Sequence, residues 1–205
     1  MDVPTRLAPL RAEFEWASER LLQRMTGPSG NSGDGASIPV PPMTDDEYLW
    51  EPVDGCWSLR RRDGEWGRGA VVLVGSGEWG RDGAPSAPWP PPFTTIAWRL
   101  SHLSDMLAGR GDHSGGTHTF DRASYAFRGD AAGGIASFVE GVDAWREALL
   151  RADDAALDTV GYSTYPYGSD AEEVFLDVVW WVNQEVLHHG AEIALLRDLY
   201  RDMHR

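Results

Sequence analysis

The sequence predicts an all-α fold: a four-helix bundle with an irregular insertion, rich in Trp, Pro and Gly, between the first two helices. Four long segments carry apolar residues at helical spacing, and strand-like alternation is scarce. A hydrophobic fraction of 42% is sufficient for a packed core. The length of 205 residues predicts a single domain over 1–205, in which 27–93 form the long connection or insertion.

The first predicted helix covers residues 5–25, where leucines and other apolar residues recur at spacings of three, four and seven. Gly, Ser and Pro dominate residues 27–42, which predicts a flexible connection. Thr44 is followed three residues later by Glu47, a capping-box pattern that predicts a short helical turn.

Residues 51–93 form the insertion, and they contain Trp57, Trp66, Trp79 and Trp89 among many Gly and Pro residues. The stretch "GAVVLVG" predicts a short strand or a buried extended segment. We expect the insertion to be ordered and packed on the bundle, because four exposed Trp side chains would be costly. A disordered linker is the alternative.

Three further helices follow. The second, "PPPFTTIAWRLSHLSDMLAGR", begins after prolines, with Thr94 or Thr95 as its N-cap. The third covers about 132–152, and the fourth covers about 171–201 with Ser169 or Asp170 as its cap.

The charge composition excludes two classes of partner. The net charge is -14, and all 18 basic residues are arginine. An acidic chain without a basic stripe is not expected to bind nucleic acid or an anionic membrane. Cys56 is the single cysteine, so a disulfide within the chain is excluded, which is typical of a reducing cytoplasm. No stretch approaches 18 uncharged apolar residues, so we expect a cytoplasmic protein without a membrane span.

Four polar residues interrupt the fourth helix, which otherwise has an apolar stripe. With Val182 at the centre of that stripe, His189 falls about 20° from it and His188 about 120° away. Glu185 falls about 60° from the centre and Glu192 about 80°. The helix therefore buries His189 and turns Glu185 inward one turn earlier, where the pair can bind one metal ion.

Two ligands are too few to hold an ion, and His102 is the best third candidate because it lies inside a strong helix. His113 and His118 lie in a Gly-rich loop instead. The position of His102 argues against it as a ligand, because it falls about 120° from the centre of the apolar stripe of its own helix. A hydrogen-bonded core histidine without any metal is the alternative reading. Glu192 is predicted to pair either with Arg197 or with a neighbouring helix.

The segments "TTIAWRLSHL" and "EVLHHGAEIALLRDLY" resemble the DinB-like (DinB/YfiT) family of bacterial metalloenzymes, and "DDEYLWEPVDGCWSLR" resembles an actinobacterial branch of it. The resemblance implies one divalent metal ion between the helices of a four-helix bundle. His102 matches the first ligand of the family's triad and His189 the last. The middle position holds Glu185, where the family usually carries a histidine. A carboxylate there favours zinc, nickel, manganese or iron over copper.

The same resemblance implies a metal-dependent enzyme that acts on a small molecule, a thiol-dependent transferase or hydrolase with mycothiol as co-substrate. A homodimer is the expected assembly. Asp105, Tyr165 and Tyr167 are too weakly indicated to be assigned as catalytic. The alternative function is a non-catalytic metal-binding or helical interaction protein, in which His188 or Glu192 supplies a fourth ligand.

Overall fold

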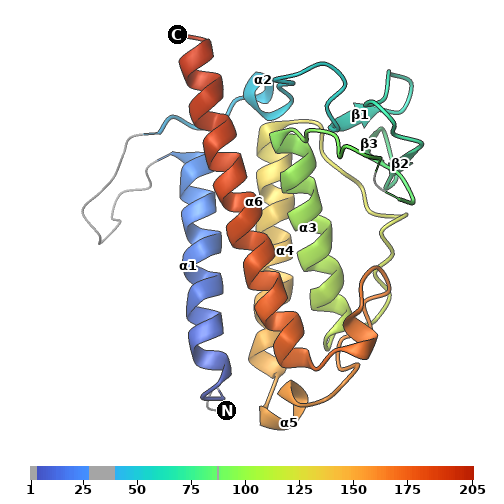
Figure 1. Cartoon of the computed structure of the whole chain (residues 1–205). Helices are drawn as coiled ribbons and strands as arrows, with labels where there is room; N and C mark the ends of the chain where they lie inside the picture. The colour runs from blue at the N-terminus through green and yellow to red at the C-terminus, as the bar shows by residue number, and fades with distance from the viewer. Residues whose placement is uncertain (1–3, 28–39, 87) are drawn as a thin grey trace.

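Four long helices lie side by side in the computed structural model, which describes residues 4–27, 40–86 and 88–205 (Figure 1). They are α1 (Leu7–Thr26), α3 (Ile96–His113), α4 (Ala131–Arg151) and α6 (Phe175–Met203). Helix α3 contacts both α4 and α6, and α1 also contacts both of these helices. The prediction of a mostly helical chain is confirmed.

The pairing of α3 with α4 depends on two glycines. A Cβ atom on Gly111 would lie 2.6 Å from the carbonyl carbon of Ala144, and one on Gly141 would lie 2.8 Å from the carbonyl oxygen of Ser104. A side chain at either position would force the helices apart, since real Cβ atoms do not approach backbone so closely. The glycines therefore set α3 close against α4, while another side of α3 faces α6.

The insertion contains a three-stranded antiparallel sheet, where the sequence predicted irregular structure. Its strands are β1 (Leu59–Arg61), β2 (Val72–Val74) and β3 (Trp79–Gly83), in the order β1-β3-β2. Leu59 pairs with Arg81, and Leu73 pairs with Asp82. Only β2 falls within the predicted segment "GAVVLVG". The central strand reads "WGRDG", and it was missed because its buried residues are charged or glycine rather than alternating apolar residues.

The buried side chain of Asp82, rather than apolar packing, organises this insertion. Its fully buried carboxylate accepts hydrogen bonds from the backbone N–H groups of Ser58 and Gly67, at 2.9 and 3.1 Å. Arg60 Nε donates to the same carboxylate at 3.0 Å. Three distant backbone segments are thereby joined by charge-assisted hydrogen bonds, which are stronger than neutral ones.

The expectation that all four insertion tryptophans pack on the bundle is wrong for two of them. Trp57 is buried and donates from Nε1 to the Arg68 carbonyl at 3.0 Å, and Trp79 is half-buried in β3. Trp66 and Trp89 are 44% and 92% exposed, respectively. Both lie in loop segments outside the three strands.

The N-caps predicted from the sequence are correct for two helices and wrong for the fourth long helix. Thr44 accepts from the Glu47 N–H and starts α2 (Asp45–Tyr48), and Thr95 accepts from the Trp98 N–H and starts α3. The predicted caps of the fourth helix are wrong. Ser169 and Asp170 introduce the single turn η1 (Asp170–Glu172), whereas α6 begins after Val174 without a side-chain cap.

The side chain of Asp170 is unavailable for capping because it is buried and paired. It accepts from Arg110 Nη2 at 2.8 Å and from the Ser163 hydroxyl at 2.7 Å. The short helix α5 (Asp154–Leu157), capped by Asp153, was not predicted. Residues 28–39 of the predicted flexible connection lie outside the described residues. Within the described part of the chain, no helix has the combination of length and apolarity needed to cross a membrane.

A buried ion pair joins α6 to α2. Arg197 Nε and Nη2 donate to the two carboxylate oxygens of Glu47 at 2.7 and 3.0 Å. The same guanidinium donates to the carbonyl oxygens of Pro41 and Arg24. Arg197 therefore has partners on three segments, and removing one of them leaves a buried charge without compensation.

We predict that Glu47→Ala lowers the free energy of unfolding by about 3–5 kcal/mol, the usual cost of an orphaned buried charge. The control is Arg201→Ala on the same helix, which removes a partly exposed pair with Asp198 and should cost less than about 1 kcal/mol. Urea unfolding followed by circular dichroism measures both. Equal losses in the two variants would contradict the assignment.

Candidate metal centre

His102 lies in the groove between α3 and α6, although it falls far from the centre of the α3 apolar stripe. The position is explained by the two neighbours of α3: the main stripe packs on α4, and the His102 side faces α6. The imidazole stacks on Trp98 with ring centroids 5.4 Å apart, and its side chain is 21% exposed. The sequence therefore identified a residue whose burial depends on a second helix contact.

Glu185 and His189 approach His102 from α6. Glu185 Oε2 lies 3.1 Å from His102 Nε2 and 3.5 Å from His189 Nε2. One potential ligand atom from each of the three residues lies within 4.8 Å of the other two. Structure and sequence thus agree that these three side chains meet, and that α6 contributes two of them one turn apart.

The neighbouring residues of α6 separate into an inner and an outer histidine, as predicted. The His189 side chain is 12% exposed and the His188 side chain is 64% exposed. Glu192 pairs with Arg99 of α3 and not with Arg197, so the contact with a neighbouring helix is the one of the two predicted alternatives that forms. Glu192 Oε2 also lies 2.8 Å from His189 Nδ1.

The contact with Glu192 determines which nitrogen of His189 faces the centre. A carboxylate accepts hydrogen bonds, so His189 Nδ1 carries the proton that it donates. His189 Nε2 then faces the Glu185 carboxylate, 3.5 Å away, on the side where a bound ion would lie. A carboxylate that holds a histidine in this way is the usual support of a metal-ligating imidazole.

The pKa shifts of Glu185 and His102 favour the protonation states that a metal ion requires. Burial raises the pKa of Glu185, but the opposing hydrogen bonds from His102 and His189 outweigh it and hold that pKa well below its ordinary value. Burial lowers the pKa of His102, against the effect of its hydrogen bond with Glu185. An ionised carboxylate and neutral imidazoles are the forms that bind metal ions.

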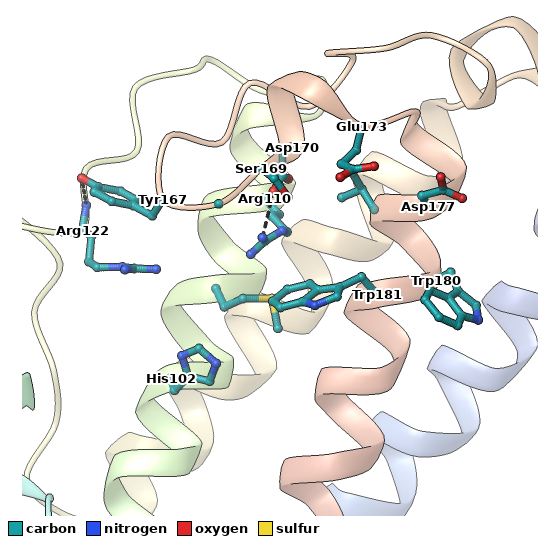
Figure 2. Close-up of a pocket in the computed structure, with 13 residues that line it drawn as sticks. His102, Arg110, Arg122, Tyr167, Ser169, Asp170, Glu173, Asp177, Trp180 and Trp181 are labelled. Carbon is teal, nitrogen blue, oxygen red and sulfur yellow. Dashed lines mark hydrogen bonds and ion pairs between the residues drawn. The ribbon is translucent and has the colours of Figure 1, made fainter. Parts of the chain in front are cut away.

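A cavity of about 520 Å³ adjoins His102 and runs along the groove between α3 and α6. His102, Met106 and Arg110 line it at intervals of four residues along α3. Figure 2 shows Trp181 reaching in from α6 and Arg122 entering from the opposite side. A cavity of this size accommodates a small organic molecule beside the cluster.

The sequence did not identify the arginines of this cavity. The spacing of Arg110 from His102 on α3 was a usable signal, whereas Arg122 lies in a loop and gave none. Among the weakly indicated residues, Tyr167 lines the cavity. Asp105 and Tyr165 are buried behind it, paired with arginines.

The comparison with protein families agrees with the resemblance of the two helical segments. A family model described as the DinB superfamily matches residues 40–193, which include α3, the insertion and most of α6. No curated protein and no solved structure matches the chain significantly. Since the family model covers well over half of the sequence and includes His102, Glu185 and His189, the chain belongs to the DinB superfamily.

Proposed function

We propose that this protein is a divalent-metal-dependent enzyme whose ion is held by His102, Glu185 and His189. The observation that carries the proposal is the convergence of two imidazoles and one carboxylate, from two helices, with ligand atoms within 4.8 Å of one another. Membership of the DinB superfamily supports it. Two nitrogen donors and one oxygen donor suit zinc, nickel, manganese or iron better than copper(I).

The three proposed ligands leave coordination positions of the ion open for water or substrate. Three protein ligands are typical of catalytic sites, whereas structural zinc sites are closed by four. A divalent ion held there supplies Lewis acidity, which lowers the pKa of a bound water or thiol. Glu192 orients His189, and Trp98 limits the rotation of the His102 ring through its stacking. The adjoining cavity holds the substrate against the same face of α3.

The reaction class we propose is a thiol-dependent transfer or a hydrolysis, with mycothiol as the thiol co-substrate. It is supported by the open donor set and by a cavity large enough for a small organic substrate. The test incubates the metal-loaded protein with mycothiol and a panel of small electrophiles, with metal-free protein as the control. Turnover is expected only with metal. The expected homodimer and cytoplasmic location stay predictions, the first measurable by light scattering.

A second candidate function is a metal-binding protein without catalysis. His188, His189 and Glu192 form a second group whose ligand atoms lie within 4.8 Å of one another. Donation by Glu192 or His188 would close the ligand set. The ion pair between Arg99 and Glu192 opposes this arrangement, because Glu192 already has a cationic partner. The enzyme is therefore the function that we favour.

We predict about one divalent ion per chain, lost in His189→Ala and retained in His188→Ala, because only His189 points into the cluster. Elemental analysis of untagged protein after reconstitution with zinc, nickel or manganese measures the stoichiometry. His188→Ala is the matched control, one residue away on the same helix. Equal loss in both variants would favour the group that contains His188 and Glu192.

Replacement of Glu185 tests the unusual middle ligand. We predict that Glu185→Ala lowers the metal affinity by at least about tenfold, since it removes one of three ligands and a compensating negative charge. Glu185→His should keep a site and shift its preference toward softer ions. Glu172→Ala removes an exposed carboxylate and should leave affinity unchanged. Titration with zinc and nickel measures all three; an unaltered affinity in Glu185→Ala would exclude Glu185 from the site.

A further inference from the structure

Two arginines line the cavity beside His102, and the first is almost completely buried. Arg110 of α3 is 4% exposed, and its Nη2 donates to Asp170 at 2.8 Å. Its guanidinium carbon lies 4.2 Å from the ring centroid of Tyr165 and 4.4 Å from that of Trp181. These cation–π contacts help to hold the guanidinium in place.

The second arginine, Arg122, enters the cavity from the connection between α3 and α4 (Figure 2). Its Nη2 donates to the Tyr165 hydroxyl at 2.5 Å, and its guanidinium lies 4.4 Å from the ring centroid of Tyr167. Its Nε lies 2.9 Å from the buried carboxylate of Asp105, which holds the head group in place. Arg122 is thus positioned before any ligand arrives, which lowers the entropic cost of binding.

The carboxylates near these arginines do not neutralise the inner part of the cavity. Asp105 also accepts hydrogen bonds from Nη1 and Nη2 of Arg81, at 2.8 and 3.0 Å, so two cations share one anion. Asp170 is matched by Arg110. Two further acids line the cavity, but they are exposed and lie at the start of α6, on the side away from Arg122 (Figure 2): Glu173 and Asp177.

Both arginines retain an unused hydrogen-bond donor. The Nε atoms of Arg110 and Arg122 are buried without a hydrogen-bond acceptor among the residues that the structure describes. Arg122 Nε is close enough to Asp105 for an ion pair, but its N–H is not aligned with a carboxylate oxygen. Both Nε atoms are shielded from the cavity, so an anion that enters it would pair with the terminal guanidinium nitrogens, which carry further N–H donors.

We propose that the cavity binds a small carboxylate with an apolar or aromatic body. Its carboxylate pairs with Arg122, assisted by Arg110, and its body lies against Met106, Val178 and Trp181 toward His102. Arg122 is tethered at Asp105, only three residues beyond His102 on α3, or about 4.5 Å along the helix axis. A small molecule can therefore reach both. This inference deepens the proposed function, on which it rests for the role of the carboxylate as substrate.

The test compares two probes of the same shape, 3-phenylpropionate and its neutral amide, by calorimetry and tryptophan fluorescence. The full-length protein is first freed of metal, so that the acid cannot bind by ligating an ion. We expect the acid to bind at least about tenfold more tightly than the amide, the usual gain from hydrogen bonds to a charged group. Arg122→Gln should abolish this preference.

The matched control is Arg128→Gln, which removes the same charge from an exposed position six residues later and should keep the preference. Equal affinity of the wild-type protein for acid and amide, absence of measurable acid binding at millimolar concentrations, or an unchanged preference in Arg122→Gln would each overturn the inference. The wild-type comparison needs no variant to fold. Metal content measured separately distinguishes failure of the metal site from failure of carboxylate binding.

Discussion

The buried carboxylate of Asp105 joins three parts of the molecule that are distant in sequence. It lies on α3 and accepts hydrogen bonds from Nη1 and Nη2 of Arg81, in the central strand of the insertion. It also pairs with Arg122, from the connection to α4. Asp105 is completely buried, and loss of one partner from such a group typically costs about 3–5 kcal/mol. The insertion and the cavity wall are therefore both attached to α3 through one side chain.

The same network reaches the candidate metal centre through aromatic contacts. The Arg81 guanidinium lies 5.6 Å from the ring centroid of Trp98, and Trp98 stacks on His102 at 5.4 Å. Cation–π contacts and ring stacking restrict side-chain rotation. The insertion is thus connected to the orientation of the first candidate ligand. This connection gives a physical reason for a polar sheet to sit against the end of a helical core.

Helix α6 buries several polar residues, and each of them is stabilised by different partners. Asn183 donates to the Leu10 carbonyl at 2.8 Å, and Arg197 is matched by Glu47. These residues have ordinary protein partners. Glu185 and His189 differ, because they converge with His102 of another helix, and one potential ligand atom from each of the three residues lies within 4.8 Å of the other two. Such a group of two imidazoles and one carboxylate can hold a metal ion.

Much of the site was predictable because helical geometry is local. The angular positions of Glu185, His188 and His189 follow from 3.6 residues per turn, and the structure places His189 inward and His188 outward as expected. The helical composition of the chain follows from apolar spacing in the same way. His102 was chosen because it lies inside a strong helix, and its contact with Glu185 is observed.

The remainder required the packed structure, since it depends on contacts between residues far apart in the chain. The strand "WGRDG" is stabilised by an ion pair with α3 and by backbone N–H donors of the insertion, so its own composition predicts no strand. The sequence predicts Ser169 or Asp170 as the cap of the fourth helix, but the buried Asp170 side chain pairs with Arg110 instead. Arg122 lies in a loop, and its side chain enters the cavity because it pairs with Asp105, which lies seventeen positions earlier in the chain. Periodicity describes which face of a helix is apolar, whereas the partner of a buried charge is chosen only when the helices and loops pack.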